Sequence, residues 1–275
     1  MNKIALVTDR QNQRGTADDR RLIKPFRQAG IRVEFTVWND PKVKWQQYDD
    51  LIFRSCWDYP QDYAAFLTWL VEMEKLKIHG WNPLPLIKWN THKSYLLELK
   101  AKGARTLPTI WLREGEPWPE MNQSSINKWV VKPLVGNSSH EVKLITANLK
   151  EEPTANERLL QPWLPEISHG EYSLIFFNRQ FSHAVLRPVT QGDFMVDNRK
   201  AELTEIPDII RQQAQEILKL VDYHLLYARV DGVMNKQKLI LMELELTEPY
   251  LFLSLSPGAE DRLVSAYLDL CQQKA

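Results

Sequence analysis

The chain has 275 residues, and its 35 basic residues balance its 35 acidic residues. A chain of this length can bury a large core and form two or three subdomains. The balanced charge excludes the strongly basic composition typical of proteins that bind nucleic acid or membrane surfaces. No apolar run approaches the roughly 20 residues that span a bilayer, and no signal-peptide pattern opens the chain. With only two cysteines, Cys56 and Cys271, we expect a cytoplasmic protein without a disulfide framework.

The first third of the chain predicts a small α/β unit with a largely parallel sheet. Strand-like apolar runs occur at residues 3–8, 32–37 and 51–54. A helical pattern ending at Gly30 separates the first two runs, and a strongly amphipathic helix is predicted after Pro60. Strands that alternate with helices in this way favour parallel pairing.

The segment RSCWDYP, residues 54–60, follows the third predicted strand. Ligands of open α/β sheets bind where the strands end, so Arg54, Asp58 and Tyr59 are candidates for binding a small polar substrate. The alternative is structural: Trp57 and Tyr59 would plug the edge of the sheet while Arg54 pairs with Asp58. Taken alone, the segment favours the structural alternative.

The clearest sign of chemistry is a predicted β-hairpin over residues 227–250. Glu243 and Glu245 are two positions apart on its second strand, so they point to one face, and strand pairing brings Asp231 near them. Three neighbouring carboxylates repel one another unless a cation is present. Mg²⁺, which prefers oxygen ligands and often accompanies nucleotide phosphates, is one explanation. A solvated outer face of an antiparallel sheet is the other, and the spacing does not decide between them.

Lys93 is a second candidate, because of its place in a helix predicted from the segment WNTHK to Gly103. Asn90 or Thr91 is the expected N-cap, which puts Lys93 in the first turn. The helix dipole disfavours a cation there unless an anion is also bound at the helix start. Otherwise Lys93 is a solvated surface lysine.

Further strands are predicted at residues 128–132, 158–162, 172–177 and 180–187. On the last of these, His183 and Arg187 share one face. We interpret His183 as a satisfied sheet histidine. Arg187 is the better candidate for binding an anion, because a guanidinium can donate two parallel hydrogen bonds.

The hairpin pattern ARVD…LILMELELTEP, together with RSCWDYP, WNTHK and the GDF triplet at residues 192–194, resembles the ATP-grasp ligases. The resemblance spans nearly the whole chain. It is nearest to the branch that contains the O-ureido-serine cyclo-ligase of cycloserine biosynthesis, and more distant from glutathione synthetase and the ribosomal-protein glutamate ligases. In those distant relatives the last metal-binding position is usually Asn, where this chain has Glu245.

The resemblance implies an α/β (α+β) ATP-grasp fold in three parts. An N-terminal pre-ATP-grasp α/β domain is expected at residues 1–88 and a central subdomain, the nucleotide lid, at residues 89–165. A C-terminal subdomain with the metal site is expected at residues 166–275. ATP and Mg²⁺ are the implied cofactors.

The resemblance also implies roles for particular residues. The nucleotide is expected to contact Lys93, Lys132, Gln161, Trp163, Leu164 and Glu166. The metal is expected on Asp231, Glu243 and Glu245. Catalytic roles fall to Arg187 and Arg229, and substrate binding to Arg54, Asp58 and Tyr59.

Two departures from the family pattern affect this interpretation. The segment after Lys132 contains Gly136 as its single glycine, where a glycine-rich flap normally closes over the phosphates. Met195 stands where the family has Arg, and Arg199 is a candidate replacement. Residue Glu171 is a further acid near the nucleotide segment without a firm role.

We therefore expect an ATP- and Mg²⁺-dependent carboxylate–amine ligase, or cyclo-ligase, that acts through an acyl phosphate on a small amino-acid-like or peptide substrate. The alternative is a degenerate ATP-grasp protein that binds a nucleotide or metabolite without ligase activity. The poor flap and Met195 favour the alternative, whereas the lysines and the three carboxylates argue against it. Neither nucleic acid nor membrane is an expected partner, and a homodimer is left open.

Overall fold

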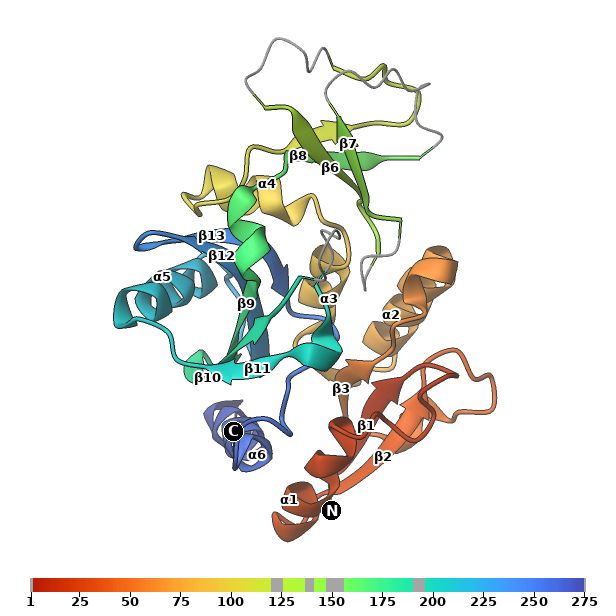
Figure 1. Ribbon diagram of the computed structural model, residues 1–275. Helices are drawn as coiled ribbons and strands as arrows, with labels where there is room; N and C mark the ends of the chain where they lie inside the picture. Colours follow the sequence, from red (N-terminus) through yellow and green to blue (C-terminus); the bar gives the residue numbers. More distant parts are fainter. Residues whose placement is uncertain (1, 120–125, 137–140, 147–155, 190–195, 275) are drawn as a thin grey trace.

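The strands of the chain form three sheets, which lie one after another along the sequence (Figure 1). The computed structural model describes residues 2–119, 126–136, 141–146, 156–189 and 196–274. We call the sheets the N-terminal, central and C-terminal sheets. Each of the three expected domains, residues 1–88, 89–165 and 166–275, contains one sheet, and we retain this division as a proposal.

The N-terminal sheet is parallel throughout, as the alternation of strands and helices predicted. Its order is β2 (Arg32–Val37), β1 (Lys3–Thr8), β3 (Asp50–Ser55) and β4 (His79–Trp81). The helices α1 (Ile23–Gln28) and α2 (Tyr63–Lys75) belong to this part of the chain. An aromatic cluster packs α2 against the sheet: Trp38, Trp45, Phe53, Tyr59, Phe66 and Trp69. The short strand β4 was not predicted.

The central and C-terminal sheets are antiparallel. The central sheet has the order β5 (Ile110–Leu112), β8 (Arg158–Pro162), β6 (Lys128–Pro133) and β7 (Lys143–Thr146). The C-terminal sheet has the order β11 (Glu202–Thr204), β10 (Gln180–Arg187), β9 (Glu171–Phe177), β12 (Tyr227–Asn235) and β13 (Lys238–Glu245). Helix α5 (Asp208–Lys219) lies between β11 and β12 in the sequence, and α6 (Ala259–Lys274) follows β13.

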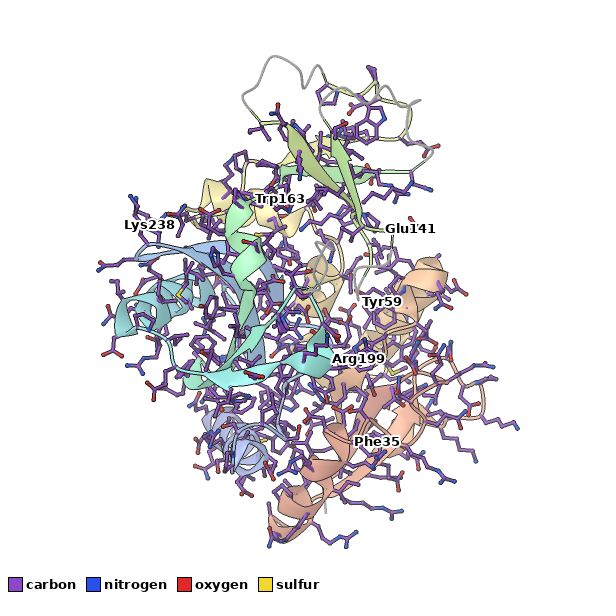
Figure 2. The ribbon with its side chains drawn as sticks, viewed as in Figure 1. Phe35, Tyr59, Glu141, Trp163, Arg199 and Lys238 are labelled. Carbon is purple, nitrogen blue, oxygen red and sulfur yellow. The ribbon has the colours of Figure 1, made fainter. Side chains whose placement is uncertain are left out.

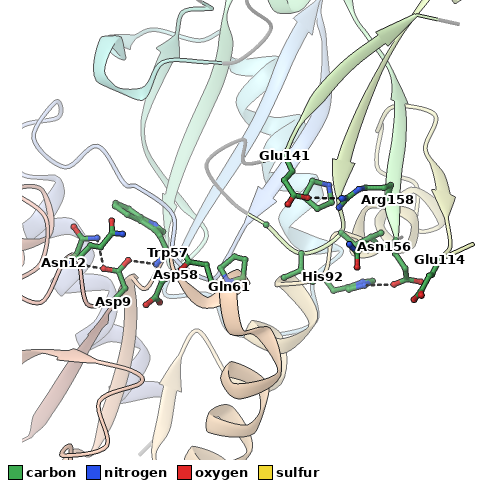
Figure 3. Close-up of a pocket in the computed structure, with 17 residues that line it drawn as sticks. Asp9, Asn12, Trp57, Asp58, Gln61, His92, Glu114, Glu141, Asn156 and Arg158 are labelled. Carbon is green, nitrogen blue, oxygen red and sulfur yellow. Dashed lines mark hydrogen bonds and ion pairs between the residues drawn. The ribbon is translucent and has the colours of Figure 1, made fainter. Parts of the chain in front are cut away.

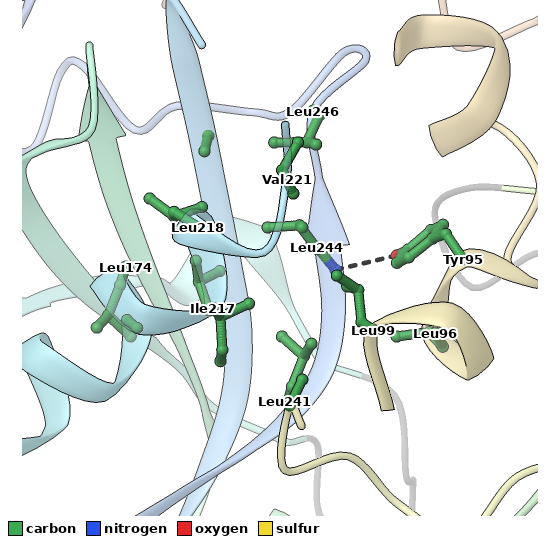
Figure 4. Close-up of a cluster of buried hydrophobic side chains, with 14 of the residues drawn as sticks. Tyr95, Leu96, Leu99, Leu174, Ile217, Leu218, Val221, Leu241, Leu244 and Leu246 are labelled. Carbon is green, nitrogen blue, oxygen red and sulfur yellow. Dashed lines mark hydrogen bonds between the residues drawn. The ribbon is translucent and has the colours of Figure 1, made fainter. Parts of the chain in front are cut away.

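The predicted hairpin is confirmed as β12 and β13, with Asp231 opposite Glu243 and Arg229 opposite Glu245. The intervening Leu244 points to the other face of the sheet, where it is buried in an apolar cluster with Leu174 and Leu218 (Figure 4). Burying a leucine side chain contributes roughly 1.5–3 kcal/mol. Since alternate residues face opposite sides, this burial fixes the carboxylates on the face that points away from the cluster.

The segment WNTHK departs from its prediction. Helix α3 (Leu84–Asn90) ends at Asn90, and Thr91 follows it as the C-cap. Helix α4 (Tyr95–Ala101) starts only after Ser94, so Lys93 lies in the connector between the two helices. The reason is that Pro85 and the apolar residues around it form a helix of their own, since proline suits a first helical turn. Neither Asn90 nor Thr91 is therefore an N-cap.

No helix within the described ranges combines the length and the apolar character that a membrane span requires.

A buried carboxylate connects the two ends of the chain. Asp50, the first residue of β3, accepts hydrogen bonds from Tyr267 Oη at 2.7 Å, Asn2 Nδ2 at 2.9 Å and Trp81 Nε1 at 3.1 Å. Burial alone would raise the pKa of Asp50, but these bonds and the neighbouring His79 outweigh it and lower the pKa below its usual value. Helix α6 is thereby tied to the N-terminal sheet.

Asp50→Asn should lower the free energy of unfolding by about 1–3 kcal/mol at neutral pH, because an amide accepts fewer of these bonds. A carboxylate with a lowered pKa stabilises the fold above the pKa of the unfolded chain, about 4, and loses that contribution as the pH falls through the folded pKa. The difference between wild type and variant should therefore shrink below about pH 4 in urea unfolding curves. Asp49→Asn, a change at the exposed neighbour whose carboxylate accepts a hydrogen bond from Lys3 N, is the control. A difference that does not depend on pH would contradict this account.

Candidate active site

The carboxylates of the hairpin are each matched by a cation. Asp231 is 1% exposed and accepts hydrogen bonds from Arg229 Nε at 2.9 Å and Ser173 Oγ at 2.6 Å. Arg187 NH2 lies 2.8 Å from its other oxygen. Burial would raise the pKa of Asp231, but the two guanidinium groups lower it. Asp231 is therefore a fully bonded, charged group.

The two glutamates of β13 are paired in the same way. Lys93 Nζ donates to Glu243 Oε1, and Arg229 NH2 donates to Glu245 Oε1. Burial would raise the pKa of Glu243, yet Lys93 and Lys132 lower it. At Glu245 burial outweighs the attraction of Arg229 and raises the pKa to about 8. Cations that the sequence pattern did not reveal therefore offset the expected repulsion at Asp231 and Glu243, whereas at Glu245 the neighbouring acids add to the effect of burial.

Arg187 and Glu171 extend this network to the neighbouring strands. Arg187, near the end of β10, lies 3.1 Å from Glu171 at the start of β9. Burial outweighs the nearby guanidinium and raises the pKa of Glu171 to about 6. Among the atoms of the described residues, Arg187 Nε has no hydrogen-bond partner.

The donors present suit Mg²⁺. The side chains of Glu243 and Glu245 are 29% and 28% exposed, so their oxygens remain accessible. In the part of the chain that the structure describes, no three Asp, Glu, His or Cys side chains stand close enough to hold a metal by themselves. Mg²⁺ in nucleotide enzymes is usually held by one or two carboxylates together with phosphate oxygens, so a pair of accessible glutamates fits it.

A small cavity of about 120 Å³ lies between the central and C-terminal sheets. Its lining includes Lys132, Gln161, Trp163, Leu164, Glu171 and Glu243, with Leu107, Ile167 and Met242 as apolar walls. Four of the expected nucleotide residues are therefore brought together. Glu166 is not among the lining residues, because its carboxylate accepts a hydrogen bond from Asn235.

Lys132 is the unusual member of this cavity. It is buried, and burial lowers its pKa to about 8 despite the attraction of Glu243. Within the described ranges its ammonium makes no hydrogen bond or ion pair. A buried cation that faces a cavity without a direct ion pair is suited to an anionic ligand.

A second cleft, of about 820 Å³, opens between the N-terminal and central sheets (Figure 3). Asp9, Trp57, Asp58 and Gln61 line one wall, and His92, Glu141, Asn156, Glu157 and Arg158 line the other. Asp9 receives the backbone N–H groups of Asn12 at 2.7 Å and Trp57 at 3.1 Å. These bonds fix the loops that follow β1 and β3.

The three expected substrate residues lie in different surroundings. Asp58 lines the cleft and accepts a hydrogen bond from Trp38 Nε1 at 2.6 Å. Tyr59 is buried and stacks on Phe66 with a centroid distance of 4.8 Å. Arg54, only 1% exposed, pairs with Asp19 at 2.9 Å and not with Asp58. Asp58 is thus the one of the three that reaches the cleft.

Other candidates have structural surroundings or lie outside the description. His183 is buried with Nε2 3.0 Å from Leu251 O, and burial lowers its pKa to about 4, which agrees with a satisfied sheet histidine. The Arg199 side chain is 90% exposed and pairs with Asp197 near β11 (Figure 2). Met195 and the flap residues 137–140 lie outside the described residues.

Sequence reasoning missed Asp9, Ser173 and the bonding role of Asn90. Asp9 directly follows β1, so the argument that ligands bind where strands end could have found it. Ser173 and Asn90 carry no local signal, because their partners, Asp231 and the backbone of β13, are 58 or more positions away in the sequence.

Comparison with known proteins places this geometry in a class. Residues 4–82 match the family model for the N-terminal domain of D-cycloserine synthetase DcsG. The cycloserine biosynthesis protein DcsG of Streptomyces lavendulae is 27% identical over 97% of this chain and 98% of its own length. The crystal structure of D-cycloserine synthetase DcsG superimposes with a TM-score of 0.87 at 25% identity, covering 98% of this chain and 99% of that one.

Two other ligases share the fold. D-alanine–D-alanine ligase from Bacillus anthracis, solved with ATP, has a TM-score of 0.69 at 14% identity and full coverage of both chains. The ATP-grasp ligase PsnB, solved with a minimal precursor, Mg and ADP, has a TM-score of 0.63 at 16% identity, covering 99% of this chain and 98% of that one.

The protein is an ATP-dependent ligase of the ATP-grasp type, an enzyme that forms C–N bonds. This confirms the predicted fold and class of enzyme. Within that class the chain is similar, along nearly its whole length, to D-cycloserine synthetase.

The pairing of Lys93 with Glu243 has a measurable consequence. Glu243→Gln should lower the free energy of unfolding by about 1.5–3 kcal/mol in the absence of nucleotide and metal, because buried Lys93 loses a charged acceptor. Urea unfolding measures this, with Glu202→Gln at an exposed position of β11 as the control. A variant as stable as wild type, or more stable, would mean that repulsion among the acids dominates after all.

Proposed function

We propose that this ligase binds Mg²⁺ and ATP between the central and C-terminal sheets and activates a substrate carboxylate as an acyl phosphate. The observation that carries the proposal is Lys132, a buried ammonium that lines the small cavity between the sheets and makes no direct ion pair among the described residues. Its cavity also contains Glu243 and the backbone of residues 161–164. Phosphate is the anion that ATP would bring to this ammonium.

The lining supports one orientation for the nucleotide. Leu107, Ile167 and Met242 offer apolar surface to a purine, and its edge would meet the strand end at Gln161–Leu164, which lines the same cavity. Lys132 and Lys93 would then neutralise the phosphates, which is the main contribution that proteins make to phosphoryl transfer. Glu171, which shares the cavity, is available to the ribose hydroxyls.

Glu243 and Glu245 are the carboxylates that would hold Mg²⁺, with Asp231 held behind them by Arg229 and Arg187. A bound Mg²⁺ would supply charge neutralisation for the phosphate oxygens. Lys93 is paired with Glu243, so binding would free its ammonium to meet phosphate. The charge on β13 is then compensated both before and after the nucleotide binds.

The two arginines receive different roles. Arg229 bonds Asp231, Glu245 and the carbonyl of Tyr250 at 3.0 Å, which leaves it no free donor pair for a substrate. We therefore assign it to holding the carboxylates. We propose that Arg187, whose Nε is without a hydrogen-bond partner among the described residues, binds the transferred phosphoryl group or the substrate carboxylate.

In the proposed reaction a substrate carboxylate oxygen bonds to the γ-phosphorus of ATP while the bond to the β-phosphate oxygen breaks, releasing ADP. An amine nitrogen then attacks the acyl carbon, loses its proton and expels inorganic phosphate. The similarity to D-cycloserine synthetase and D-alanine–D-alanine ligase supports a small amino-acid-like substrate. The cleft beside Asp9 and Asp58 is the proposed place for it.

An ADP-release screen tests this function. Purified protein with Mg²⁺ and ATP should release ADP and phosphate in equal amounts with at least one small amino or ureido acid, and mass spectrometry should find a product one water lighter than its reactants. Binding of ATP without turnover on any such acid or on short peptides would instead support a nucleotide-binding protein that does not ligate.

Lys132→Met should weaken binding of Mg²⁺ with a non-hydrolysable ATP analogue by roughly 10–100-fold, the usual loss of a charge-assisted bond to phosphate. The ratio of wild-type to variant affinity should fall above about pH 8, because the pKa of Lys132 is about 8 and only the protonated form attracts phosphate; taking the ratio cancels the ionisation of Glu245 over the same range. Calorimetry across this pH range measures both effects. For Lys143→Met, at an exposed position of β7, the same ratio should stay close to one across the pH range. Equal affinities in wild type and Lys132→Met would remove Lys132 from the site.

A further inference from the structure

Strand β13 lies at the edge of the C-terminal sheet. On its outer edge the backbone groups of Leu244 and Leu246 face away from β12, so they need partners other than a strand. The side chain of buried Asn90 provides two of them. Its Nδ2 donates to Leu244 O at 2.8 Å, and its Oδ1 accepts from Leu246 N at 2.8 Å.

These two bonds flank Glu245. In a parallel sheet, a residue bonds to the two residues that flank its opposite neighbour on the adjacent strand. The Asn90 side chain makes the same pair of bonds, with Glu245 in the place of the opposite neighbour. A primary amide donates from its nitrogen and accepts at its oxygen, so it reaches both backbone groups; an ionised carboxylate has no donor, and a hydroxyl has a single oxygen for both roles. Tyr95 Oη completes the edge by accepting from Leu244 N at 3.0 Å (Figure 4).

The same segment delivers Lys93. Asn90 is the last residue of α3, Tyr95 is the first residue of α4, and Lys93 lies in the connector between them. The backbone N–H of Lys93 donates to Leu134 O at 2.8 Å, and Leu134 belongs to the segment that follows Lys132. One connector thus joins the strand of the carboxylates to the strand of the second lysine.

We propose that Asn90 is a positioning residue of the nucleotide site, which sets the register between Lys93 and the two glutamates of β13. The inference rests on the proposed function, since it concerns the site that would hold Mg²⁺ and ATP. Asn90 touches neither ligand. It acts by holding the backbone between Glu243 and Glu245 at a fixed distance from the connector that carries Lys93.

Asn82 provides a matched control. It is also buried, and its side chain makes three hydrogen bonds to this hairpin region, to Tyr227 O, Leu246 O and Leu226 N at 2.7–2.9 Å. Asn82 shares Leu246 with Asn90 but binds its carbonyl, not its N–H; it makes no bond to Leu244, and it is not in the connector. Loss of either asparagine should lower stability, but only loss of Asn90 should disturb the site.

The test compares Asn90→Ala with Asn82→Ala by calorimetric titration of Mg²⁺ and a non-hydrolysable ATP analogue, at a temperature where circular dichroism shows both folded. Asn90→Ala should bind about 10-fold or more weakly, the usual effect of losing a group that orients metal ligands. It should also need more Mg²⁺ for half-saturation. Asn82→Ala should stay within about threefold of wild type although its melting temperature also falls.

Equal losses in the two variants, or an unchanged affinity in Asn90→Ala, would overturn the proposal and leave Asn90 a purely structural residue. If Asn90→Ala does not fold, Tyr95→Phe decides, because it removes only the hydroxyl that binds Leu244 N; it should weaken binding at least threefold, and unchanged binding would again overturn the proposal. A wild-type protein that fails to bind the nucleotide would instead overturn the proposed function, and this inference with it.

Discussion

The ion pairs that surround Asp231 are the interaction on which this site depends. An isolated carboxylate in so buried a position would be very costly, and breaking one side of a buried pair typically costs several kcal/mol. Arg229 from the same strand and Arg187 from β10 remove that cost at Asp231. Because Arg229 also bonds Glu245, the hairpin and its neighbours are held in one arrangement.

In this arrangement the acidic side chains remain accessible to a metal, while the paired cations reduce the repulsion between the carboxylates. The glutamates of β13 are held by Lys93 and Arg229, yet about a quarter of each side chain remains open. Lys132 is the complementary element, a cation kept buried on the opposing sheet. A nucleotide that carries Mg²⁺ matches both, since it brings negative phosphates to the lysines and positive charge to the glutamates.

Local patterns were sufficient to predict much of this. The two-residue alternation of the hairpin fixed the faces of Glu243 and Leu244, because a strand buried on one face admits no other register. The alternation of strands and helices predicted the parallel N-terminal sheet, because strands separated by helices favour parallel pairing. The positions of Lys132, Gln161, Trp163 and Leu164 around one cavity agree with the family resemblance.

What local patterns could not show depends on partners distant in the sequence. Arg54 looked available for a substrate, but Asp19 and the carbonyl of Pro249 take up its donors. The sequence pattern predicted repulsion among the acids of the hairpin. It could not show that Lys93 pairs with Glu243, because the two residues are 150 positions apart. Asn90 looked like a helix cap, whereas its amide serves the edge of β13, an edge that exists only after the sheet has formed.

The central claim is that charge is exchanged at β13 when the nucleotide binds. A crystal structure of the protein with Mg²⁺ and a non-hydrolysable ATP analogue tests it most directly. The account predicts a metal ion on Glu243 and Glu245, Lys132 and Lys93 on the phosphates, and Arg229 still on Asp231. A nucleotide bound elsewhere, or one bound between the sheets while Lys93 remains paired with a metal-free Glu243, would contradict it.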